Sequence, residues 1–138
     1  MKVFFDTNVY VAEALLGPTA ERMVSATLAA AWRIFVSEHV LSEVASVLTD
    51  QLGFSPRLAV LTRIRVARRS TLVKESSTRH VVPHDPNDSA ILRAALAANA
   101  DYLVTNDRHL LALDPYHGLR ILSLTDYFQL LQTQGLIP

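Results

Sequence analysis

Residues 100–107 read Ala-Asp-Tyr-Leu-Val-Thr-Asn-Asp. The run Tyr102–Thr105 is short and apolar, which is typical of a strand buried in a parallel sheet. A carboxylate, Asp107, follows the run almost directly. In open α/β sheets, ligands bind beyond the carboxyl ends of the strands. The residues that follow each strand are therefore the candidates for function.

Short β-rich runs and helical patterns alternate on both sides of this stretch. The other predicted strands are 2–5, 33–36, 81–83 and 119–122, and the predicted helices are 9–16, 19–31, 37–51, 57–69, 88–99, 109–111 and 125–134. The helix at 88–99 is expected to begin at Asp88 as its N-cap. The alternation predicts a single α/β domain over residues 1–138, with a mostly parallel central sheet of about five strands flanked by helices.

Acidic residues follow the predicted strands. They are Asp6, Glu43, Asp85, Asp88 and Asp107. In a parallel sheet they gather at one edge, where two unit charges ~4 Å apart repel by about 4 kcal/mol at an effective dielectric of 20. A hard cation such as Mg²⁺ or Mn²⁺ relieves this repulsion, since these ions prefer carboxylate oxygen. Each acid also has an ordinary interpretation: helix capping for Asp6 and Asp88, a solvated helix face for Glu43 and a turn for Asp107. The joint placement favours a metal site.

Composition sets further limits. The 138 residues include no cysteine, so disulfides, thiolate metal sites and cysteine nucleophiles are excluded. No stretch has the pattern of a signal peptide or a membrane span, and we expect a cytoplasmic protein. The 13 basic and 13 acidic residues cancel, but unevenly along the chain. Residues 57–79 carry a net +6, and this basic segment is a candidate RNA-binding surface, a solvated face, or a docking surface for an acidic partner.

Four blocks of the sequence resemble the PIN-domain family, in particular the VapC-type toxin ribonucleases. The blocks are 3–8, 37–43, 88–95 and 100–110, and the resemblance spans essentially the whole chain. The last block resembles the toxin–antitoxin subgroup most closely. The resemblance implies an endoribonuclease that depends on Mg²⁺ or Mn²⁺ and leaves 5′-phosphate and 3′-hydroxyl ends.

The resemblance also implies roles for individual residues. The catalytic set carries over onto Asp6, Glu43, Asp88 and Asp107, of which Asp6, Asp88 and Asp107 are the expected metal ligands. Three residues are expected to support these acids: Asn8, Thr105 and Asp85. Arg65, Arg68, Arg69 and Arg108 are the candidate contacts to RNA or to a partner. His109 is interpreted as a helix-start residue rather than a catalyst.

The same residues allow one leading interpretation and two alternatives. The leading interpretation is the toxin of a type II toxin–antitoxin pair, with an antitoxin partner and a homodimeric state that both follow from the resemblance. An RNA-processing nuclease without an antitoxin would need the same acids. A non-catalytic RNA- or protein-binding module is less consistent with the complete acidic set, since loss of activity tends to leave gaps among such residues.

Overall fold

The computed structural model describes residues 1–75, 80–83 and 85–138. Five strands form one sheet in the order β3-β2-β1-β4-β5, and every pairing is parallel. The strands are β1 Lys2–Phe5, β2 Arg33–Ser37, β3 Thr71–Val73, β4 Tyr102–Val104 and β5 Arg120–Leu122. The predicted fold class, a single α/β domain with a five-stranded parallel sheet, is confirmed.

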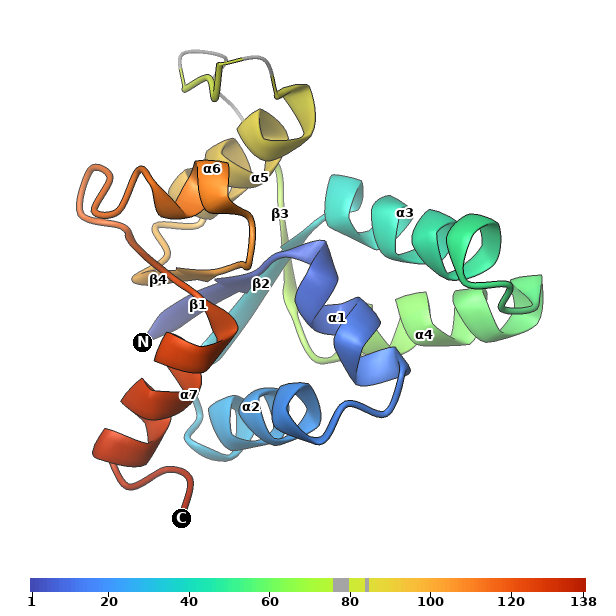
Figure 1. The fold of residues 1–138 in the computed structure, drawn as a ribbon, viewed down its shortest axis with the longest axis horizontal. Coiled ribbons are helices and arrows are strands. Elements are labelled where there is room, and N and C mark those ends of the chain that lie inside the picture. Colours follow the sequence, from blue (N-terminus) through green and yellow to red (C-terminus); the bar gives the residue numbers. More distant parts are fainter. Residues whose placement is uncertain (76–79, 84) are drawn as a thin grey trace.

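Helices cover the sheet and connect its strands. They are α1 Thr7–Ala14, α2 Pro18–Ala29, α3 Glu38–Ser46, α4 Pro56–Arg68, α5 Pro86–Ala97, α6 Arg108–Leu111 and α7 Leu124–Thr133. A π-helical turn, Val47–Gln51, continues α3. In Figure 1, α5 and α6 lie above the sheet, α2 and α7 lie side by side below it, and the α3–α4 pair extends to the right.

The central strand β1 is the most deeply placed part of the core. Val3, Phe4 and Phe5 are fully buried, and the Phe5 ring makes edge contacts with Tyr10 of α1 and Tyr127 of α7. Burial on both faces explains why the strand is apolar throughout instead of alternating. The polar chain that follows β1, beginning at Asp6, therefore emerges at the carboxyl edge of a rigid sheet.

The predicted third strand at 81–83 is wrong. The third strand is Thr71–Val73, which pairs with β2 at the sheet edge. Val82 is buried outside the sheet, where the Ser89 hydroxyl bonds both its backbone N–H and its carbonyl. Both segments are short and rich in β-branched residues, so composition could not separate them. Asp85 and Asp88 consequently reach the site on a helix and not at a strand end.

The predicted N-cap of α5 is also wrong by three residues. The Asp85 carboxylate, not that of Asp88, caps the helix by accepting a hydrogen bond from the Asp88 N–H at 3.0 Å. Pro86 occupies the first helical position, where a missing N–H costs nothing. Asp88 is thereby turned inward and is only 2% exposed.

None of the helices in the described part of the chain is long and apolar enough to cross a lipid bilayer.

Candidate active site

Asp6 stands at the junction of β1 and α1, and both of its carboxylate oxygens are bonded. The Thr7 N–H donates to Oδ1 at 2.6 Å, which makes Asp6 the N-cap of α1. The Thr105 hydroxyl, at the end of the neighbouring strand, donates to Oδ2 at 2.7 Å. Burial raises the pKa of Asp6, these two hydrogen bonds lower it, and the Glu43 and Asp107 carboxylates raise it further. The pKa of Asp6 is raised overall, which means that the site disfavours having all of its carboxylates ionised at once.

Thr105 ties two of the predicted acids together. Its hydroxyl donates to Asp6 and accepts a hydrogen bond from the Asp107 N–H at 3.0 Å. The side chain is completely buried. The structure thus brings Thr105 into contact with two of the acids that it was expected to support, Asp6 and Asp107.

Asp107 caps the short helix α6. Its Oδ1 accepts from the backbone N–H groups of His109 at 2.8 Å and Leu110 at 3.3 Å. Glu43 comes from α3 on the other side of the site, and the Thr7 hydroxyl donates to its Oε1. Together with Asp6 and with Asp88 of α5, these residues bring carboxylates to the candidate site from four separate segments of the chain.

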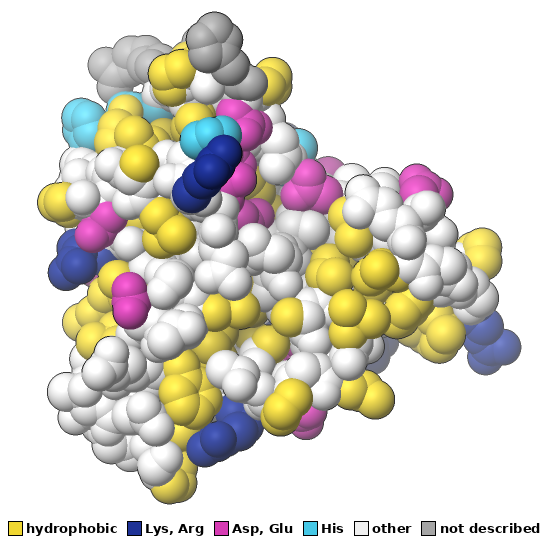
Figure 2. All heavy atoms as spheres, in the orientation of Figure 1, with side chains coloured by type: hydrophobic (Ala, Val, Ile, Leu, Met, Phe, Trp, Pro, Cys, Tyr) yellow, Lys and Arg dark blue, Asp and Glu magenta, His cyan; other side chains and the backbone are white. Residues whose placement is uncertain are grey.

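The acids meet in one open cavity with a volume of ≈ 380 Å³. Its walls are formed by Asp6, Thr7, Asn8, Val11, Glu43, Val47, Asn87, Asp88, Asn106 and Asp107. The four predicted catalytic acids and Asn8 all belong to this wall. In Figure 2, acidic side chains gather in the upper centre of this face, between the regions of α6 and α3.

Asp88 has the most perturbed environment of these acids. Burial and the facing carboxylates of Asp107 and Asp85 raise its pKa to about 8. Its Oδ2 is buried and has no hydrogen-bond partner among the described residues. An unsatisfied buried carboxylate oxygen costs stability, since it has lost its water without replacement. The pKa of Asp85 moves the other way, because the Asp88 N–H and carboxyl group bond it and His109 lies nearby.

This donor set suits a divalent cation. Every candidate ligand atom of the four predicted catalytic acids is a carboxylate oxygen, the cavity is open to water, and one buried oxygen lacks a partner among the described residues. Mg²⁺ and Mn²⁺ take such oxygens together with several waters. A cation here would remove both the mutual repulsion and the unsatisfied oxygen.

Two asparagines of the cavity wall, Asn87 and Asn106, do not belong to the predicted catalytic or supporting set. Asn87, in the first turn of α5, is bonded to His39 of α3, and this bond joins two helices that each carry a predicted catalytic acid. Asn106 accepts a hydrogen bond from the Leu124 N–H at 3.2 Å and so ties the β4 end to α7. Its position between Asp85 and Asp88 in the sequence could have marked Asn87 as a cavity residue. Its contact with His39 could not be predicted, because it depends on how α3 and α5 pack.

The basic segment lies mainly on α4, and the described cavity wall includes no residue of that helix. Arg65 and Arg68 are exposed, whereas the Arg69 guanidinium bonds both oxygens of the buried Glu13 carboxylate at 2.8 and 2.6 Å. Burial alone would lower the pKa of Arg69, but Glu13 outweighs it and raises the pKa. Arg69 therefore stabilises the packing of α1 against the end of α4. Arg79 lies outside the described residues.

Arg108 and His109 follow Asp107 at the mouth of the cavity. Both residues lie in the first turn of α6, and both side chains are exposed. The His109 ring approaches Asp85 and Asp107, with Nδ1 3.7 Å from Asp85 Oδ2 and 3.9 Å from Asp107 Oδ1. The predicted position of His109 at a helix start is confirmed, and its contact with Asp85 was not foreseen.

Comparison with known proteins is consistent with this architecture. A solved structure, VapBC2 from Rickettsia felis bound to a DNA fragment from their promoter, contains a chain similar in fold, with a TM-score of 0.66 and 18% identity over 89% of this chain and 98% of that one. No curated protein sequence matches this chain. A family profile described as PIN domain matches residues 2–109, which include all the predicted catalytic acids. The chain therefore belongs to the PIN domain family.

Proposed function

We propose that this protein is a metal-dependent endoribonuclease that hydrolyses RNA phosphodiester bonds, and that it is the toxin of a type II toxin–antitoxin pair. One observation carries the proposal. Four carboxylates from separate segments line one open cavity, and a buried oxygen among them, Asp88 Oδ2, has no partner in the described part of the chain. Such an arrangement is costly without a bound cation and useful with one.

Asp6, Asp88 and Asp107 would hold a Mg²⁺ or Mn²⁺ ion, directly or through water. When bound, the cation supplies positive charge to the scissile phosphate and makes a nearby water more acidic. The protein fixes the ligands beforehand. Asp6 is held by Thr105 and the Thr7 N–H, and Asp107 is held by two N–H groups of α6.

Glu43 would position or deprotonate the attacking water. Its Oε1 accepts from the Thr7 hydroxyl, and the side chain keeps 27% of its surface exposed within the cavity wall. The Thr7 contact orients the carboxylate without covering it. A general base needs this combination of fixed direction and access to water.

The RNA backbone would be bound by cationic side chains around the cavity. Arg108 is exposed at the first position of α6, directly after the metal ligand Asp107. Arg65 and Arg68 on α4 offer a second, more distant basic surface. Contacts of this kind bind phosphates without regard to sequence and weaken as salt is added.

An antitoxin partner and a homodimer belong to the same proposal. The antitoxin partner is supported by the likeness in fold to a chain of the VapBC2 complex, whereas the homodimer follows from the resemblance to the family. A co-purification test follows: a small protein encoded beside this gene should bind the chain and suppress its RNA cleavage. Cleavage that persists in a stable complex would argue for an RNA-processing nuclease instead.

The central experiment compares Asp6→Asn with the wild type on cellular RNA in the presence of Mn²⁺. Asn still accepts the Thr7 N–H, so the variant should fold and lose cleavage. Asp101→Asn is the matched control, since Asp101 lies at the opposite edge of the sheet, where it accepts the Lys2 N–H. Cleavage should leave 5′-phosphate ends and stop when EDTA is added. Equal cleavage by Asp6→Asn and the wild type, after parallel purification, would refute the site assignment.

A further inference from the structure

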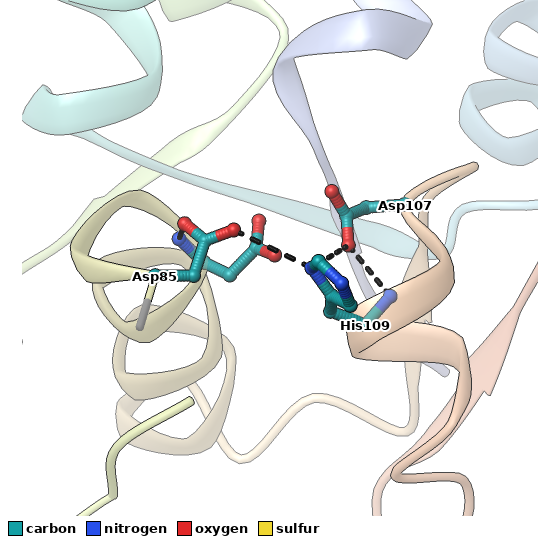
Figure 3. Close-up of side chains that lie close together, drawn as sticks. Asp85, Asp107 and His109 are labelled. Carbon is teal, nitrogen blue, oxygen red and sulfur yellow. Dashed lines mark hydrogen bonds and ion pairs between the residues drawn. The ribbon is translucent and has the colours of Figure 1, made fainter. Parts of the chain in front are cut away.

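His109 adds a nitrogen to the acidic cluster at the outer edge of the cavity. One ligand atom from each of Asp85, Asp88, Asp107 and His109 lies within 4.8 Å of all the others. Figure 3 shows the His109 ring between Asp85 and Asp107, which project toward it from the N-cap positions of α5 and α6. Asp85 and His109 are not among the proposed catalytic acids, so the grouping is a new one.

Each carboxylate of this group keeps one oxygen for a ligand. Asp85 uses Oδ1 to cap α5 and turns Oδ2 toward His109. Asp107 uses Oδ1 to cap α6, and no hydrogen bond to its Oδ2 is found among the described residues. The helix caps therefore orient the two carboxylates without exhausting them.

A second observation points to a ligand in this place. The Asp88 carboxylate, which faces both Asp85 and Asp107, is 2% exposed, and its Oδ2 has no partner among the residues described. Buried polar atoms in proteins are almost always paired. An ion held by this group would supply the missing partner.

The present His109 contacts are too long to be hydrogen bonds. Nδ1 lies 3.7 Å from Asp85 and 3.9 Å from Asp107, beyond the range of about 2.7–3.2 Å for N–H···O. Neighbouring ligand atoms of an octahedral ion with bonds of ~2.1 Å are about 3 Å apart. Each of the two His109 contacts would have to shorten by less than about 1 Å to match neighbouring ligand positions, and the His109 side chain is 57% exposed.

We propose that Asp85, Asp88, Asp107 and His109 form a cation site with a nitrogen ligand, and that His109 makes this site select Mn²⁺ over Mg²⁺. The inference deepens the proposed function and rests on it. Both ions prefer oxygen ligands, but Mg²⁺ is held by oxygen and water alone, whereas Mn²⁺ belongs to the first-row series whose members gain affinity from a nitrogen donor, and is the weakest binder of that series. The contribution of His109 should therefore be felt by one ion and not by the other.

The test measures metal binding to the full chain, without RNA. Mn²⁺ affinity is read from the electron paramagnetic resonance signal of the free ion, and Mg²⁺ affinity from competition. His109→Asn should weaken Mn²⁺ binding by at least about tenfold, the lower end of the loss seen even for residues that only support a ligand. Mg²⁺ affinity should stay unchanged. His117→Asn is the control, because His117 has a φ of 49°, which Asn tolerates, and it is not part of the cluster.

A spectroscopic readout separates coordination from simple charge. Electron spin echo modulation of bound Mn²⁺ should show coupling to ¹⁴N of an imidazole in the wild type, and the coupling should vanish in His109→Asn. Bound Mn²⁺ without this coupling, or equal losses for Mn²⁺ and Mg²⁺, would overturn the inference and leave the proposed function standing. A wild-type protein that binds neither ion would remove the metal from the proposed function as well.

Discussion

Replacing Asp88 by Asn should make the metal-free protein more stable while destroying its proposed activity. The Asp88 carboxyl is buried against Asp107 and Asp85, and its pKa is raised from 3.8 to about 8. The folded protein therefore keeps a proton that the unfolded chain releases near pH 4. Because the folded state binds more protons between about pH 4 and 8, the free energy of unfolding falls as pH rises through this range.

The size of the effect follows from the shift. At about 1.4 kcal/mol for each pKa unit, the cost of Asp88 at pH 7 reaches about 4 kcal/mol. Asn carries no charge, and its amide can donate to the neighbouring carboxylates. Asp85 and Asp107 still repel each other in the variant, so we expect a gain of about 2–4 kcal/mol at pH 7, or roughly 6–12 °C in melting temperature for a domain of this size.

Urea unfolding in EDTA at pH 5 and pH 8 measures this gain directly. The difference between Asp88→Asn and the wild type should be larger at pH 8 than at pH 5. Asp126→Asn, in the exposed first turn of α7, controls for the loss of one negative charge and should show no such pH dependence. Mn²⁺ should then stabilise the wild type and not Asp88→Asn. A variant that is less stable than the wild type at pH 8, or a difference that does not change with pH, would refute the reasoning.

Three other changes test separate parts of the structure. Arg69→Met leaves the buried Glu13 carboxylate without its main partner and should cost about 3–5 kcal/mol in urea unfolding, with most of the loss recovered in the Glu13→Gln double variant; equal stability of the single variant and the wild type would contradict this. Thr105→Val removes the hydroxyl that bridges Asp6 and Asp107, and should cost about 1–3 kcal/mol and weaken Mn²⁺ binding measured by calorimetry; unchanged values for both would deny the bridge its role. Arg65→Glu with Arg68→Glu should weaken RNA binding and flatten its salt dependence in a filter-binding assay, while an unchanged slope would identify α4 as a solvated face.

Much of the fold was predictable because its signals are local. The apolar runs 3–5 and 103–104 are buried in the centre of the sheet, and an alternating α/β pattern favours strands for runs of that kind. The segment from 71 to 83 was harder. It holds two short β-branched runs, and the choice between them depends on pairing with β2 and on the Ser89 hydroxyl, neither of which is encoded nearby.

In the candidate site, too, the features with local sequence signals were predictable and the long-range contacts were not. Asp6 and Asp107 were expected at strand ends and lie there, because the chain direction of a parallel sheet places them at one edge. The approach of His109 to Asp85 and the pairing of Arg69 with Glu13 join residues 24 and 56 positions apart in the sequence. No periodicity records such contacts, so Arg69 was taken as a surface residue when its side chain is in fact largely buried.

Three acids of this protein have two positions at once: Asp6, Asp85 and Asp107 each cap the start of a helix and also lie at the candidate site. Asn begins helices as well as Asp does. A single base change in an Asp codon yields Asn, so one mutation can silence such a site while the fold survives. Under the proposed function, a host population under pressure from this protein would collect inactive but intact copies at these positions. A survey of disabled alleles should therefore find Asp-to-Asn changes enriched at the helix starts over changes that unfold the chain.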